Sequence, residues 1–89
     1  MAQLADKWSL LIINALGDGA KRNGELMRSV EGISQKMLTQ TLRNLTKLHI
    51  VSRQDLQTIP PHVIYDLTPL GKSLRQEAVS LIRWVENHM

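Results

Sequence analysis

The stretch SQKMLTQTLRNLTKL, residues 34–48, decides the fold of this 89-residue chain. Its leucines repeat at steps of four, three and three, which is the spacing of one apolar helix face: Leu38, Leu42, Leu45 and Leu48. Ser34 carries a hydroxyl of the kind that caps helix N-termini, so we expect the helix to begin there. Downstream, His49 is expected to end the helix with a positive φ, which histidine tolerates better than most residues.

The opposite face of this helix is polar and basic. Four long side chains fall within about 60° of one another on a helical wheel: Lys36, Gln40, Arg43 and Lys47. Such a stripe suits duplex DNA, because cations neutralise phosphates while Arg reaches guanine and Gln reaches adenine. Thr39 flanks the stripe, where it can contact a thymine methyl or a phosphate. An ordinary solvated helix face is the alternative interpretation of the stripe alone.

Acidic residues are missing around this helix. From Gly32 to Gln54 there are four cations and no Asp or Glu, whereas the rest of the chain holds seven cations and eight acids. Solvated helices usually mix Glu with Lys, because oppositely charged pairs four residues apart are stabilising. The asymmetry, with a net charge of +3 and a pI near 9.7, therefore favours a polyanionic partner.

Short elements precede the stretch. A first helix is expected from about Asp6 to Leu16, and residues 20–22 are long enough only for an edge bridge. Asn23 can cap a second helix that ends by Val30, followed by the turn Glu31-Gly32-Ile33. Two short helices joined by such a turn make a helix-turn-helix.

A hairpin and a long helix follow the stretch. Strands are expected over Val51–Leu56 and Val63–Leu67, and Thr68-Pro69 starts a last helix that is ~27 Å long.

The predicted fold is mainly α with a small β-hairpin wing (α+β): a winged helix-turn-helix with a three-helix core, a two- or three-stranded sheet and a long C-terminal dimerisation helix. We expect one domain over residues 1–89. The candidate DNA contacts of the wing are Arg53, Thr58, Pro60, Pro61 and His62. For the two prolines, loop stiffening is the simpler role.

The first and last helices carry more apolar surface than a domain of this size can bury. The first helix is apolar nearly all round, and the last one is longer than the rest of the domain can cover. We therefore expect a homodimer whose interface includes Leu4, Leu10, Ile13, Leu81, Trp84 and Val85.

Composition and motifs argue against several other classes. The chain has no cysteine, and its three histidines lack ligand-like spacing, so we expect no metal and no cofactor. It has neither a glycine-rich phosphate loop nor a nucleophile elbow, and we expect no enzyme activity. No stretch is apolar enough to span a bilayer, and no signal peptide pattern is present. We expect a cytoplasmic, nucleoid-associated protein with no membrane partner.

The chain resembles the HxlR-type winged helix-turn-helix regulators, which are related in fold to the MarR-like proteins. The matching motifs, in order, are Asp6-Lys7-Trp8, Leu11-Ile12-Ile13, Glu25-Leu26, residues 33–39, Leu42-Arg43-Asn44-Leu45, Pro60-Pro61, Val63, Tyr65 and Leu67-Thr68-Pro69-Leu70-Gly71. His49 stands where the family usually has glycine, and Ile64 stands where it usually has an acidic residue. Many members sense oxidants through an upstream cysteine, which has no counterpart in these 89 residues.

The resemblance implies a homodimer that places two recognition helices in successive major grooves of a palindromic operator. It implies that Ser34, Lys36, Thr39, Gln40 and Arg43 face DNA, with the wing around Pro60 and His62. Gln35 is a further candidate DNA contact of the same helix. The leading hypothesis is a sequence-specific transcriptional regulator that acts as a repressor. The alternative is a winged-helix protein-interaction module that has lost DNA binding. A small-molecule effector held beside Trp8 or Trp84 is compatible with the first hypothesis.

Overall fold

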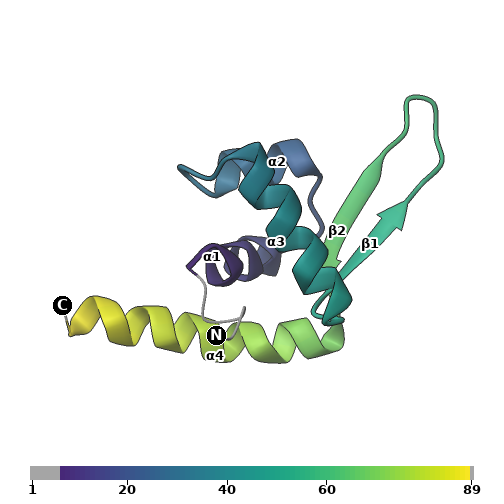
Figure 1. Cartoon of the computed structure of the whole chain (residues 1–89). Coiled ribbons are helices and arrows are strands. Elements are labelled where there is room, and N and C mark those ends of the chain that lie inside the picture. Colours follow the sequence, from purple (N-terminus) through teal and green to yellow (C-terminus); the bar gives the residue numbers. More distant parts are fainter. Residues whose placement is uncertain (1–6, 89) are drawn as a thin grey trace.

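A computed structural model describes residues 7–88 of the chain, and it is mainly helical with one hairpin (Figure 1). The elements are α1 (Lys7–Ala15), the 3-10 turn η2 (Leu16–Asp18), α2 (Asn23–Ser29), α3 (Gln35–Lys47), β1 (Val51–Asp55), β2 (Val63–Leu67) and α4 (Pro69–Asn87). This architecture confirms the predicted fold class. The molecule measures 48 × 27 × 26 Å, because the hairpin and the far half of α4 project from the three-helix body.

The core lies between α1, α2 and α3. Leu38, Leu42 and Leu45 are at most 2 % exposed and pack with Ile12, Ile13 and Leu26. The predicted apolar face of α3 is therefore confirmed for three of its four leucines. Leu48 is 44 % exposed, because α3 ends at Lys47 and the chain has already turned away from the core at the next residue.

The ends of α3 follow from particular side chains. Ser34 Oγ accepts the backbone N–H of Met37 at 3.1 Å, which confirms Ser34 as the N-cap. His49 has φ = 60°, as predicted, and its N–H donates to the carbonyl of Thr46 at 3.0 Å. The N–H of Ile50 then donates to the carbonyl of Leu45 at 3.0 Å. The backbone therefore reverses within two residues and leads directly into β1.

The start of α2 differs from the prediction. Asn23 is the first helical residue and Arg22 occupies the N-cap position. Glu25 Oε1 accepts the N–H of Arg22 at 3.0 Å. Because the third helical residue supplies this cap, the Asn23 side chain is not needed for it.

The sheet has two antiparallel strands with Val51 opposite Leu67 and Arg53 opposite Tyr65. One isolated bridge adds Lys21 to the edge of β2, through hydrogen bonds of 2.9 and 2.8 Å with the backbone of Tyr65. Residues 20–22 thus form an edge bridge, as expected, rather than a third full strand.

The N-terminus of α4 is bound to the corner where α3 leads into β1. Thr68 caps the helix by accepting the N–H of Gly71 at 3.0 Å, with Pro69 in the first turn as predicted. The hydroxyl of Thr68 lies 2.6 Å from the carbonyl oxygen of His49. The backbone N–H of Thr68 donates to the carbonyl of Ile50 at 3.0 Å. A Cβ on Gly71 would collide with the carbonyl oxygen of Ile50. This close approach fixes α4 to the end of α3.

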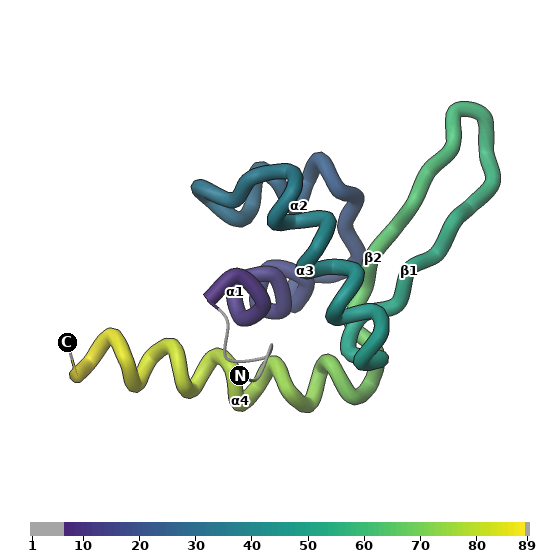
Figure 2. Tube along the Cα trace, viewed as in Figure 1, coloured from purple at the N-terminus to yellow at the C-terminus, as the bar shows by residue number. Residues whose placement is uncertain are grey.

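The far half of α4 extends past the body (Figure 2) and keeps apolar side chains in solvent. Leu81, Trp84 and Val85 are 48 %, 58 % and 38 % exposed, and Leu10 on α1 is half-buried. The structure corrects one expectation here: Ile13 has no exposed surface and belongs to the core, so it offers nothing to a partner. Leu4 lies outside the described residues.

We predict that Gly71→Ala lowers the free energy of unfolding by about 2 kcal/mol or more, because the new methyl group must displace the Ile50 backbone. The matched control is Gly24→Ala in α2, where a Cβ meets only Arg28 at 3.8 Å. That variant should gain up to about 1 kcal/mol from the better helix propensity of alanine. Urea denaturation at a fixed protein concentration measures both, and equal effects of the two substitutions would contradict the proposed role of Gly71.

Candidate nucleic-acid interface

The outer face of α3 is an exposed polar stripe. Lys36, Gln40, Arg43 and Lys47 are all exposed, while Leu38, Leu42 and Leu45 hold the other side of the helix in the core. Burial of the leucines therefore fixes the direction in which the stripe points. The structure brings these four predicted residues together on one surface.

The N-terminal end of α3 adds three further polar side chains. Ser34, Gln35 and Thr39 are exposed, and the Gln35 amide donates to the Thr39 hydroxyl at 3.0 Å. Ser34 uses its hydroxyl oxygen as the helix cap, which leaves its proton available to an acceptor outside the protein. These residues border the same surface as the cationic stripe.

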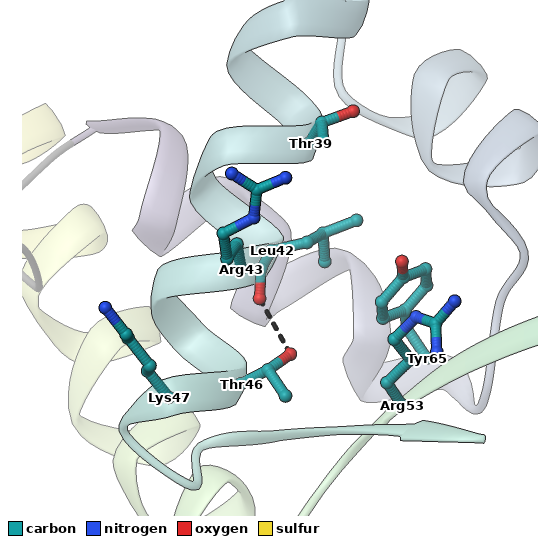
Figure 3. A pocket seen from close by; sticks show the side chains of 7 residues that line it. All are labelled: Thr39, Leu42, Arg43, Thr46, Lys47, Arg53 and Tyr65. Atoms are coloured by element: carbon teal, nitrogen blue, oxygen red, sulfur yellow. Dashed lines mark hydrogen bonds between the residues drawn. The ribbon is translucent and has the colours of Figure 1, made fainter.

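A groove of about 440 Å³ runs between α3 and the hairpin (Figure 3). It is lined by Thr39, Leu42, Arg43, Thr46, Lys47, Arg53 and Tyr65. Two of its cations come from α3 and the third, Arg53, comes from β1. The groove therefore collects positive charge from both sides, which is the arrangement that a polyanionic strand requires.

The strand register places Arg53 in this groove. Side chains alternate between the faces of a strand, so Arg53 shares a face with the buried Val51 and with its cross-strand partner Tyr65. Figure 3 shows the Arg53 and Tyr65 side chains next to each other on the hairpin side of the groove. The bridge to Lys21 holds the backbone of Tyr65, and its side chain packs against the hydrophobic core.

Sequence reasoning did not include Thr46 and Tyr65 among the site residues. Thr46 donates its hydroxyl to the carbonyl of Leu42 at 2.7 Å, so it shapes the groove wall from within α3. Tyr65 was identifiable from strand alternation, because Leu67 is buried and Tyr65 lies two residues earlier on the same face.

The wing residues form a separate group. Thr58, Pro60 and Pro61 are exposed in the loop between β1 and β2, and His62 is half-buried at its base. Figure 1 shows this loop at the end of the hairpin away from α4. Of the predicted wing contacts, only Arg53 therefore lies beside the α3 stripe.

Neither a metal-binding cluster nor a membrane-spanning helix is found in the described part of the chain. Over residues 7–88, no three His, Asp or Glu side chains come close enough together to hold a metal ion. None of the described helices combines the length and the apolar character needed to cross a membrane.

A three-helix core that exposes a cationic third helix beside a hairpin wing defines a winged-helix transcriptional regulator of the DNA-binding class. The comparison with known proteins narrows this class. The chain belongs to the HxlR-like helix-turn-helix family, whose model matches residues 3–89. Its relatives are transcriptional regulators and not enzymes.

Individual relatives agree with the family assignment. YtfH of Escherichia coli, an HTH-type transcriptional regulator, is 36 % identical over 86 residues, covering 97 % of this chain and 68 % of the relative. The HTH-type regulator YodB of Bacillus subtilis is 40 % identical over 83 residues, covering 93 % and 74 %. The solved structure of ytfH from Salmonella typhimurium superposes with a TM-score of 0.87 at 38 % identity, covering 94 % of this chain and 75 % of that one.

We predict that Arg53→Ala weakens duplex binding and lowers the slope of log affinity against log salt by about one, because one phosphate contact is lost. Fluorescence anisotropy between ~50 and 200 mM salt measures the slope. Arg83→Ala is the matched control, since Arg83 is also exposed but lies on α4. Identical slopes for the two variants would contradict the assignment of Arg53 to a phosphate.

Proposed function

We propose that this regulator is a sequence-specific repressor that binds a palindromic operator as a homodimer. The observation that carries the proposal is the acid-free cationic face of α3, which continues across the groove to Arg53 on the wing. The exposed face of α3 carries only positive charge. It suits the major groove of DNA, which is wide enough to admit one α-helix.

Within this proposal, the side chains of α3 have different tasks. Arg43 and Gln40 have the geometry to form paired hydrogen bonds with guanine and adenine, and Thr39 can contact a thymine methyl group. Lys36 and Lys47 lie toward the two ends of α3, where they neutralise phosphates on either side of the bases. Gln35 positions Thr39 through their 3.0 Å hydrogen bond.

The groove between α3 and the hairpin receives one sugar-phosphate strand in this proposal. Lys47 and Arg53 approach the strand from opposite walls, and the Tyr65 hydroxyl supplies a neutral donor beside Arg53. Because the α3 and β1 walls are joined by the short reversal at His49 and Ile50, their spacing is set by the fold.

The homodimer is proposed from a second, apolar groove of about 380 Å³ between α1 and the far half of α4. It is lined by Lys7, Leu10, Leu11, Leu81, Ile82, Val85 and Glu86, and Trp84 is 58 % exposed nearby on α4. A second copy that covers this surface removes the apolar side chains from water. Twofold symmetry then presents two α3 helices to half-sites about 34 Å apart.

We predict that Arg43→Ala costs about 1–3 kcal/mol in binding and relaxes the choice of base at one position of each half-site. Lys47→Ala should instead weaken all duplexes to a similar extent, because a phosphate contact carries no base information. Fluorescence anisotropy on duplexes from the protein's own promoter region, and on oligonucleotides selected from a random pool, measures both effects. Parental affinity and parental base preference for Arg43→Ala would overturn the role given to this residue.

The alternative, a protein-interaction module without DNA binding, makes the opposite prediction for salt. Phosphate neutralisation requires affinity to fall steeply between ~50 and 200 mM salt. Duplex binding that is absent, or that is flat over this range, would favour the interaction module. Its support in the structure is the exposed apolar row Leu81, Trp84 and Val85.

We predict that Leu81→Glu converts the dimer to monomers, because a carboxylate placed in the interface loses its hydration. Leu70→Glu is the matched control: Leu70 is 57 % exposed on the same helix, but it lies in the first turn of α4. Sedimentation velocity at micromolar concentration should give a monomer for the first variant and the parental dimer for the second. A parental sedimentation coefficient for Leu81→Glu would contradict this interface.

A further inference from the structure

The tip of the wing is apolar and completely exposed. Ile59 is 100 % exposed, whereas the next most exposed large apolar residue, Trp84, is 58 % exposed. Leu56 is 38 % exposed, and Pro60 and Pro61 are also exposed, so Ile59 is part of a patch and not an isolated surface residue. The proposed contacts of α3 and Arg53 with DNA give this patch no task.

The loop that carries Ile59 is held in one shape. The N–H of Leu56 donates to the carbonyl of His62 at 2.9 Å and closes its base. Asp55 Oδ1 accepts the N–H of Gln57 at 3.0 Å, and the Thr58 hydroxyl donates to the carbonyl of Pro60 at 2.8 Å. With two prolines in addition, the loop presents Ile59 with little conformational entropy left to lose on binding.

The charge of the tip excludes phosphate neutralisation as its main mode of contact. Between Gln54 and Ile64 there is no Lys or Arg, and Asp55 is acidic. The cations of the proposed DNA surface end at Arg53, at the base of the hairpin. The tip therefore meets DNA without a Lys or Arg side chain, and Ile59 is exposed there beside the uncharged Gln57 and Thr58.

The reach of the hairpin suits one location on the duplex. At about 3.3 Å per residue, the five paired residues of each strand carry the loop about 16 Å from the corner at Val51 and Leu67. Half a helical turn of DNA, the offset from a major groove to the neighbouring minor groove, is about 17 Å. Figures 1 and 2 show the loop projecting away from the body beside α3, with no other element over it.

From these observations we infer that Ile59, supported by Pro60, is an apolar wedge that enters the minor groove next to each half-site. The inference rests on the proposed mode of DNA binding. Apolar side chains in the minor groove contact sugars and partly unstack a base step, which bends the duplex. The wedge therefore adds a preference for an easily deformed pyrimidine–purine step at a position that α3 never contacts.

The test compares Ile59→Ala with Leu70→Ala, which removes an apolar side chain that is 57 % exposed on α4. Because Ile59 makes no contribution to the core, both variants should keep the parental circular dichroism spectrum and thermal midpoint. Ile59→Ala should bind the operator about tenfold more weakly with an unchanged salt slope, and fluorescence energy transfer between the duplex ends should report a smaller bend. Leu70→Ala should match the parent in both respects.

A modified duplex locates the contact. Replacing adenine by 2,6-diaminopurine in the flanking step adds an amino group to the minor groove and leaves the major-groove edge unchanged. Parental binding should fall severalfold on this duplex, and binding by Ile59→Ala should not fall further.

Equal affinity and bend for Ile59→Ala and the parent would overturn the wedge and leave the tip free for a protein partner. A lowered salt slope would also overturn it. Failure of the parent to prefer any duplex would instead overturn the proposed function itself.

Discussion

Burial of one face of α3 is the constraint on which the rest of the structure depends. Leu38, Leu42 and Leu45 are almost fully enclosed by α1 and α2, and their burial fixes the rotation of the helix about its axis. A helix turned by about 180° about its axis would move the leucines out of the core and the cationic stripe into it. The same packing that stabilises the domain thus orients its DNA-binding surface.

A second constraint links this helix to the other functional surfaces. The backbone reversal at His49 and Ile50 leads α3 into the wing. Thr68, the N-cap of α4, directs its hydroxyl at the carbonyl oxygens of these two residues. The close approach of Gly71 leaves no room for sliding at this corner. The recognition helix, the wing and the base of the proposed dimerisation helix therefore meet at one rigid junction.

Sequence periodicity predicted the elements well where a residue had one dominant local role. The caps at Ser34 and Thr68, the positive φ of His49 and the edge bridge at Lys21 follow from local chemistry and are confirmed. The cap of α2 was one local error, because Arg22 and not Asn23 occupies the N-cap position. The other errors arose where tertiary packing decides. Ile13 was expected at the dimer interface, yet it is buried, because α2, α3 and α4 all pack against this short helix. Predicting that Tyr65 lines the groove required the strand register, and predicting that Ile59 is exposed required the conformation of the loop.

The central claim is that the exposed face of α3 and the hairpin form one continuous DNA surface. Amide chemical-shift mapping of the isotope-labelled protein with its operator duplex tests this claim most directly. Our account predicts large shifts along residues 35–47 and 53–62, with smaller shifts over residues 81–85 of α4. Shifts confined to the far half of α4, with α3 unchanged, would contradict it.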